Sequence, residues 1–115
     1  MKNKFIIIIP CYNVEKWISL NLRLVKMQSY KRFECVIIDD GSSDNTVKII
    51  KREIEEDSRF TLIQNKERAG SSLKNYYNAF YSVNPNDDDI VIWLDGDDWF
   101  SSVFVLQYLN EFYGA

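Results

Sequence analysis

The chain has 115 residues, a length that fits one compact domain and leaves no room for two. Hydrophobic residues make up 46% of it and aromatic residues 15%, enough for a buried core, so a disordered chain is not expected. The formal net charge of −3 argues against a dedicated nucleic-acid-binding protein, because such proteins present a basic face.

The first half of the chain predicts two strands and two helices. Residues 5–9 form a β-branched apolar run that predicts a strand buried on both faces. Apolar residues recur at helical spacing over 14–25 and predict the first helix. Residues 33–38 predict a second buried strand, and we expect Ser42 or Ser43 to cap the helix that follows.

The second half repeats the alternation. Residues 60–63 predict a shorter third strand, and Gly70-Ser71-Ser72 is expected to open the third helix. Residues 90–94 predict a fourth buried strand. The last helix, over about 102–112, has apolar residues at helical spacing, namely Val105, Tyr108, Leu109 and Phe112.

This order of elements predicts the fold class. Strands that alternate with helices imply an α/β protein with a mostly parallel sheet of about four strands and right-handed crossovers. Helices then cover both faces of the sheet. We expect residues 1–115 to form a single domain of this kind.

The residue types exclude some chemistry. The sequence has no histidine, so a His-based catalytic triad is impossible. Its two cysteines, Cys11 and Cys35, lie in or beside apolar runs, and we expect both to be buried thiols. The first apolar run, at 5–9, is shorter than the roughly 7–15 residues of a signal-peptide core. No stretch approaches the ~20 apolar residues of a membrane span.

Polar residues follow the predicted strands. Because the carboxyl ends of parallel strands share one edge of a sheet, five aspartates should converge there. Crowded carboxylates need a cation to stay ionised together, and oxygen ligands favour Mg²⁺ or Mn²⁺. The alternative is that Asp39, Asp40 and Asp44 serve only in turns and caps. The strand ends carry Pro10-Cys11-Tyr12-Asn13, Asp39-Asp40 and Asp95-Gly96-Asp97-Asp98.

Two other classes of protein place acidic residues at strand ends, and both fit poorly. Phosphatases of the haloacid dehalogenase type carry an Asp-x-Asp motif on the first strand, whereas here it follows the fourth. Receiver domains carry their phosphorylated aspartate at the end of the third strand, which here ends in Gln64-Asn65.

Taken together, four segments resemble glycosyltransferase family 2, the inverting enzymes of the GT-A fold. The combination of Asp-Asp-Gly-Ser-Ser-Asp after one strand and Asp-Gly-Asp-Asp after a later one is specific, and the resemblance covers nearly the whole chain. The matching segments are residues 7–13, residues 36–44, the helix start at Gly70 and residues 93–99.

The resemblance implies a Rossmann-like domain that binds a nucleoside-diphosphate sugar. Pro10 and Tyr12 would lie against the base, with Tyr12 stacking on it. Asp40 would accept a hydrogen bond from the base, which favours uracil because its N3–H is a donor. The implied nucleotide-sugar-binding residues also include Asn13 and Asp39.

The remaining implied residues belong to the sugar and the metal. Asp95 and Gly96 would contact the ribose or the sugar, and Asp98 would orient the donor sugar. Asp97 would hold Mn²⁺ or Mg²⁺ on the diphosphate. Lys74 stands near the place where many relatives have an arginine that reaches the nucleotide, and a solvated helix lysine is the alternative.

The implied activity is sugar transfer to an acceptor hydroxyl in glycan or polysaccharide synthesis, in the cytoplasm, where nucleotide sugars are made. The family supplies the general base from an acceptor-side region beyond the metal motif, so we expect the base outside this chain. We favour the hypothesis that this chain is a portion of a longer transferase. The alternatives are a nucleotide-sugar-binding module without transferase activity and a homodimer that completes its acceptor site through exposed apolar residues of the last helix.

Overall fold

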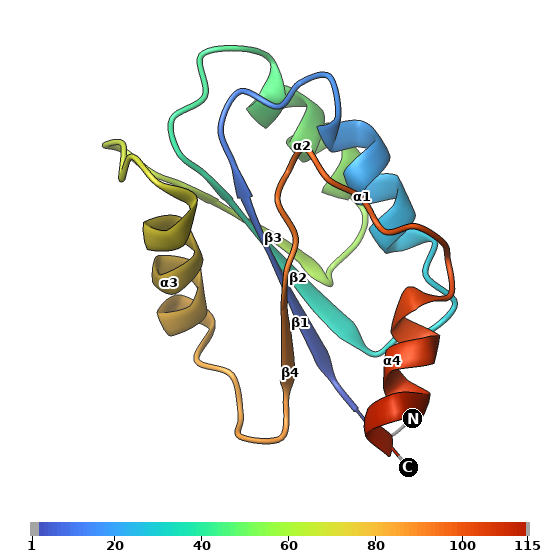
Figure 1. Cartoon of the computed structure of the whole chain (residues 1–115). Helices are drawn as coiled ribbons and strands as arrows, with labels where there is room; N and C mark the ends of the chain where they lie inside the picture. Colours follow the sequence, from blue (N-terminus) through green and yellow to red (C-terminus); the bar gives the residue numbers. More distant parts are fainter. Residues whose placement is uncertain (1–2, 115) are drawn as a thin grey trace.

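The structure, a computed structural model, describes residues 3–114, so residues 1, 2 and 115 of the predicted domain lie outside it. Strands and helices alternate along the chain: β1 (Phe5–Cys11), α1 (Ile18–Lys26), β2 (Phe33–Asp39), α2 (Thr46–Ile54), β3 (Phe60–Gln64), α3 (Ser72–Val83), β4 (Ile90–Trp93) and α4 (Val105–Gly114). The four strands form one parallel sheet of order β3-β2-β1-β4. The predicted α/β class is confirmed (Figure 1).

The sheet is buried on both faces at β1, which lies between β2 and β4. Every residue of β1 is buried, which explains its uninterrupted apolar run. Successive side chains of β1 point to opposite faces of the sheet, and each face has its own apolar core. Ile7 and Ile9 pack with α1, α2 and α4 on one face, whereas Ile6 and Ile8 pack with α3 on the other. Figure 1 shows α3 alone on one side of the sheet and the other helices opposite it.

The topology reverses between β1 and β4. The chain passes through α1 and α2 on one face to reach β2 and β3, then through α3 on the other face to place β4 beside β1. Ligands of open α/β sheets bind at the carboxyl ends of the strands at such a switch point. The chains leaving β1 and β4 stay together, since Leu94 N donates to Ile8 O (2.9 Å) and Gly96 N to Pro10 O (3.0 Å).

Three helices begin later than predicted, among them α4, which begins at Val105 rather than at about residue 102. Helix α1 begins at Ile18, and Val14 is buried in the preceding loop, where its N–H donates to the Thr46 hydroxyl (2.9 Å). The cap predicted at Ser42 or Ser43 is wrong, because α2 begins at Thr46. The Ser42 hydroxyl donates instead to a carboxylate at the end of β2.

The last strand and helix also differ from the prediction. Strand β4 lies at the edge of the described sheet, so it is partly exposed rather than buried, and it ends at Trp93. Helix α4 buries Leu106, whereas Tyr108 and Phe112 of the predicted apolar face are exposed. The Leu106 N–H donates to the buried Gln28 Oε1 (3.1 Å), so Gln28 satisfies one of the free N–H groups in the first turn of the helix.

Two further predictions concern the whole chain. Both cysteines are buried free thiols, as predicted. Within residues 3–114, the helices are all too short or too polar to cross a membrane.

Candidate functional site

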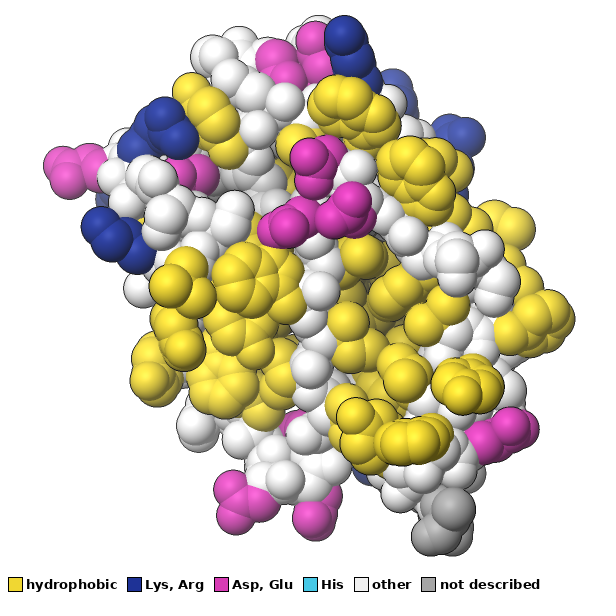
Figure 2. Space-filling view, in the orientation of Figure 1, with side chains coloured by type: hydrophobic (Ala, Val, Ile, Leu, Met, Phe, Trp, Pro, Cys, Tyr) yellow, Lys and Arg dark blue, Asp and Glu magenta, His cyan; other side chains and the backbone are white. Residues whose placement is uncertain are grey.

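A hollow of about 210 Å³ lies where β1 and β4 end. It brings together five residues that the sequence assigned to a site, and it adds Val14 and Ser72. Figure 2 shows acidic side chains gathered on this face with apolar side chains on either side of them. The predicted residues that line the hollow are Pro10, Tyr12, Asp95, Gly96 and Asp97.

The acidic group of this site consists of Asp95, Asp97 and Asp98. One carboxylate oxygen from each lies within 4.8 Å of the others, and the side chains of Asp97 and Asp98 are exposed. Three negative charges at this spacing repel one another unless a cation lies between them. An all-oxygen donor set is the kind that Mg²⁺ and Mn²⁺ prefer, so these residues fit the predicted metal.

Negative charge at the site also acts on the thiol of Cys11. Burial raises the pKa of Cys11 well above its usual range, and the charges of Asp39, Asp95 and Asp97 raise it further. In the absence of a metal ion, the thiol therefore stays protonated at neutral pH.

Gly96 lets the acidic loop lie directly against β1. A Cβ atom at this position would lie 2.7 Å from Cys11 Sγ and 3.0 Å from Val14 Cγ2. Real Cβ atoms do not approach other atoms so closely, so a larger residue would push the loop away from the strand. The glycine in Asp-Gly-Asp-Asp is thus required by packing.

Trp93 orients one of the three carboxylates, a role that the sequence analysis missed. Its Nε1 donates to Asp95 Oδ1 (2.7 Å), and its ring stacks on Tyr76 with centroids 4.7 Å apart and planes 11° apart. Residues two apart in an extended segment share a face, which is the one sequence signal for this pair.

Asn21 holds the backbone of the same loop and was also missed. It is fully buried on α1, and its Nδ2 donates to Asp95 O (3.1 Å) and Asp98 O (2.8 Å). Its Oδ1 has no hydrogen-bond partner among the described residues. A buried polar atom without a partner costs about 1–3 kcal/mol. The sequence signal was a polar residue on the buried face of an otherwise apolar helix stripe.

The carboxylate of Asp39 is used within its own turn. It accepts hydrogen bonds from Gly41 N (3.1 Å) and Ser42 N (2.9 Å) as well as from the Ser42 hydroxyl. Gly41 adopts a left-handed conformation, with φ of 80°, which this turn requires. In this structure Asp39 has the turn role that was its alternative, and its contact with a nucleotide stays a prediction.

Asp40 is buried and anchors the loop before α3. Its carboxylate accepts from Asn65 Nδ2 (3.0 Å), Ala69 N (2.7 Å) and Gly70 N (3.0 Å). Burial favours the neutral acid, but these hydrogen bonds together outweigh it and lower the pKa of Asp40 to about 2. The predicted five-carboxylate cluster is therefore divided: three form the acidic group, and Asp39 and Asp40 bind backbone donors. A contact between Asp40 and a base stays a prediction.

The ring of Tyr12 lies at the exposed wall of the hollow and is covered on one face by Arg68. The guanidinium carbon of Arg68 is 3.6 Å from the ring centroid, and its Nε is 3.6 Å from Asp40 Oδ2. This is cation–π geometry. No spacing in the sequence linked Arg68 to Tyr12, because the two come from different loops.

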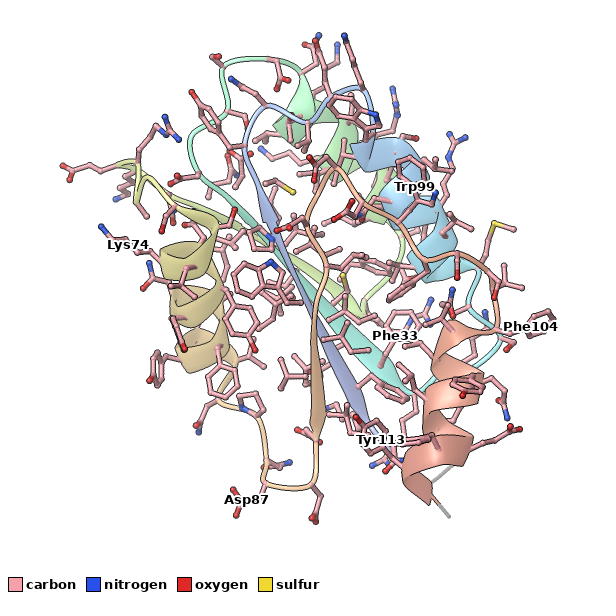
Figure 3. All side chains as sticks on the ribbon, in the orientation of Figure 1. Phe33, Lys74, Asp87, Trp99, Phe104 and Tyr113 are labelled. Carbon is pink, nitrogen blue, oxygen red and sulfur yellow. The ribbon has the colours of Figure 1, made fainter. Side chains whose placement is uncertain are left out.

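The other predicted nucleotide residues lie at the margin of the site. Asn13 has φ of 51°, and its Oδ1 accepts from Ser43 N (2.8 Å), so it ties the loop after β1 to the loop after β2. Lys74 is exposed in the first turn of α3 and projects from the outer side of that helix (Figure 3). Its part in nucleotide binding stays a prediction.

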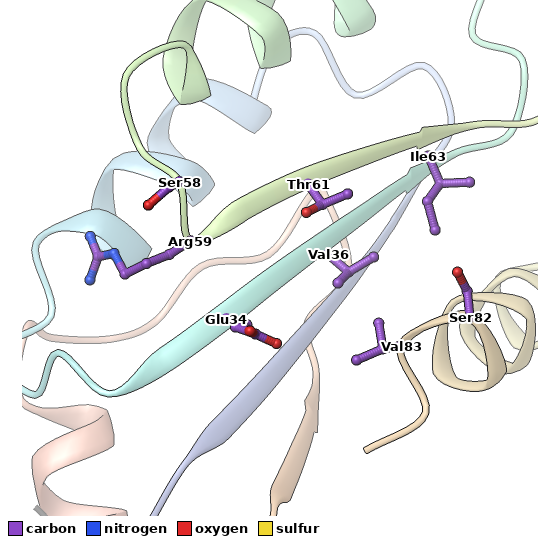
Figure 4. A pocket seen from close by; sticks show the side chains of 8 residues that line it. All are labelled: Glu34, Val36, Ser58, Arg59, Thr61, Ile63, Ser82 and Val83. Carbon is purple, nitrogen blue, oxygen red and sulfur yellow. The ribbon is translucent and has the colours of Figure 1, made fainter. Parts of the chain in front are cut away.

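A second hollow, of about 300 Å³, lies on the α3 face of the sheet and is lined by β2, β3 and the end of α3 (Figure 4). Its one guanidinium, that of Arg59, is already paired with Asp57 (2.7 Å) and lies over the Phe33 ring (4.2 Å).

In a parallel sheet of this kind, the switch point with its aromatic wall and acidic loop is the place where a ligand is expected to bind. The sequence matches glycosyl transferase family 2 over residues 6–113, and the chain belongs to that family. The family assigned from the sequence motifs is therefore confirmed.

Two curated relatives show the range of proteins that the chain is similar to. It is 31% identical over 103 residues to glycosyltransferase GlyA of Streptococcus pneumoniae. This match covers 90% of the present chain and 14% of GlyA. It is 28% identical over 111 residues to the teichoic acid poly(glycerol phosphate) polymerase of Staphylococcus epidermidis. This match covers 96% of the present chain and 15% of the polymerase. The chain thus spans a small part of each of these proteins.

Solved structures share the fold. S. aureus TarS 1–349 in complex with UDP matches with a TM-score of 0.85 and 26% identity, over 96% of this chain and 32% of that one. The mannosyltransferase PcManGT from Pyrobaculum calidifontis, in complex with GDP-Man and Mn²⁺, matches with a TM-score of 0.72 and 24% identity, over 90% and 30%. These likenesses confirm the predicted GT-A fold.

Proposed function

We propose that the chain is the donor-binding domain of a metal-dependent glycosyltransferase, which transfers a sugar from a nucleoside diphosphate to an acceptor hydroxyl in glycan or polysaccharide synthesis. The chain belongs to family 2, and the observation that carries this proposal is the hollow at the switch point, which Tyr12 lines together with Asp95 and Asp97 of the acidic group. A uracil nucleotide is favoured, in keeping with the UDP complex of TarS.

The chain's own residues divide the donor between them in this proposal. Tyr12 offers the base the ring face that Arg68 leaves uncovered, with Pro10 beside it in the lining of the hollow, and Asp95 accepts a hydrogen bond from a ribose or sugar hydroxyl. Asp97 and Asp98 are exposed carboxylates that would hold a divalent cation. When bound, such a cation neutralises the negative charge of the diphosphate leaving group.

The hydroxyl of the acceptor needs a base, and the site offers none of the right kind. Carboxylates committed to a cation are weak bases, and the Cys11 thiol is buried with a raised pKa. We therefore propose that the general base and the acceptor-side contacts come from protein beyond these residues. Donor binding is the part of the reaction that this chain performs.

A panel of nucleotides tests the proposal. In calorimetric titrations with Mn²⁺ present, we expect UDP to bind more tightly than GDP, CDP or ADP. Tyr12→Ala should weaken UDP binding about tenfold or more, since base–aromatic stacking contributes about 1–3 kcal/mol per base. The matched control is Tyr81→Ala, because Tyr81 is an exposed tyrosine of α3 that does not line the hollow. Equal binding of all four nucleotides, or unchanged binding by Tyr12→Ala, would contradict the assigned base site.

A further inference from the structure

We infer that Asn21 is a positioning residue for the cation site: its buried amide holds residues 95–98 in the turn that brings the three carboxylates together. The inference rests on the proposed function, because it concerns the cation that the acidic group would hold. Asn21 itself touches no carboxylate in the structure and acts through the backbone.

The amide closes the turn at both of its ends. The two hydrogens of Nδ2 are shared between Asp95 O (3.1 Å) and Asp98 O (2.8 Å), the first and last carbonyls of the turn. Asp98 N also donates to Asp95 O (3.0 Å), the bond that joins the first and fourth residues of a β-turn. Asn21 thus braces from α1 a turn that carries three like charges.

The brace also decides which oxygens remain for a cation. Both carbonyls accept hydrogen bonds from the buried Nδ2 of Asn21, which engages them with α1. The carboxylates of Asp97 and Asp98 are left as oxygen donors for the cation, beside that of Asp95, with one oxygen of each within 4.8 Å of the others. Without Asn21, the bonds from Asp98 N to Asp95 O and from Gly96 N to Pro10 O would be left to hold the turn against repulsion among these charges.

The orientation of the amide follows from its surroundings. If Nδ2 and Oδ1 were exchanged, an oxygen would face two carbonyl oxygens, so the donor end must point to the turn. The Oδ1 atom gains no partner among the described residues in return. The two bonds that Nδ2 makes to the turn explain why Asn21 lies in the core although its Oδ1 has no partner there.

Manganese affinity measured in the presence of saturating UDP tests this role. We expect Asn21→Leu, which keeps the volume and removes the donors, to weaken Mn²⁺ binding about 10- to 100-fold, the usual effect of losing a group that orients metal ligands. The matched control is Gln28→Met. Gln28 is an equally buried amide that binds Leu24 O, Ser102 O and Leu106 N, all outside the turn. Its loss should lower thermal stability and leave Mn²⁺ affinity unchanged.

The outcomes separate the two proposals. If the wild-type protein binds no Mn²⁺ with UDP, the proposed function fails. If it binds and Asn21→Leu binds equally well, or if Gln28→Met loses the same affinity, the role of Asn21 is overturned. If Asn21→Leu does not fold, the wild-type protein still allows a test. Adding Mg²⁺ and UDP to it should shift the NMR signals of the Asn21 side-chain amide and leave those of Gln28 in place. Unmoved Asn21 signals on a protein that binds both would also overturn it.

Discussion

Replacing Asp97 with asparagine is expected to abolish metal-dependent nucleotide binding. The substitution keeps the shape of an exposed side chain and removes one of the three charges that lie within 4.8 Å of one another. Loss of a group that merely orients metal ligands weakens affinity about 10–100-fold, so loss of a ligand itself should exceed a hundredfold. Calorimetric titration of UDP with Mn²⁺ would report this as binding too weak to measure.

The fold should survive this change. Because Asp97 is exposed and repelled by its neighbours, the variant should unfold at the wild-type temperature or above it when no metal is present. Asp88→Asn is the matched control, since Asp88 is an exposed aspartate in the loop before β4, at the opposite end of that strand from the acidic group. An Asp97→Asn protein that binds UDP and Mn²⁺ as the wild type does would remove Asp97 from the metal site.

Replacing Asp40 with alanine should have the largest effect on stability. The buried carboxylate accepts hydrogen bonds from Asn65 Nδ2, Ala69 N and Gly70 N, and alanine leaves all three donors without it. Hydrogen bonds to a charged group contribute about 1.5–3 kcal/mol each, although they are not additive, so we expect a loss of about 3 kcal/mol in the free energy of unfolding. Urea denaturation measures it. Asp87→Ala, at the exposed tip of the loop before β4 (Figure 3), should change it little.

Acid should remove the contribution of Asp40. The hydrogen bonds lower the pKa of this carboxyl from 3.8 to about 2 in the folded protein. A lowered pKa means that the stabilisation is complete above pH 4 and is lost as the pH falls towards 2, a difference of about 2 kcal/mol. The pKa values of Asp44, Glu53 and Asp57 are lowered as well. The pH dependence of stability is therefore compared between the wild type and Asp40→Ala. Stability that falls equally steeply with acid in the wild type and Asp40→Ala would contradict this role.

Much of the fold and part of the site follow from residues that are adjacent in the sequence. The apolar run of β1 predicts a strand buried on both faces, and the order of elements predicts a parallel sheet. Parallel strands place their carboxyl ends at one edge, so Tyr12 and the aspartates that follow β4 could be assigned to one site before any coordinates were known. The structure places both beside the same hollow.

The contacts that tune the site could not be predicted, because they join segments far apart in the chain. Asn21 and Asp98 are 77 positions apart, and Gln28 and Leu106, whose bond lies in the first turn of α4, are 78 apart. Asp40 was ambiguous for a different reason. An aspartate at a strand end suits both a ligand and a turn, and only the position of the 65–70 loop shows which donors it meets.

Binding of a metal–nucleotide complex by the acidic group and the Tyr12 wall can be measured by titrating UDP into the wild-type protein. With Mn²⁺ present we expect saturable binding at one site, and with EDTA in its place we expect that binding to be lost. A folded protein that binds no UDP with Mn²⁺, or that binds it equally well in EDTA, would contradict the claim.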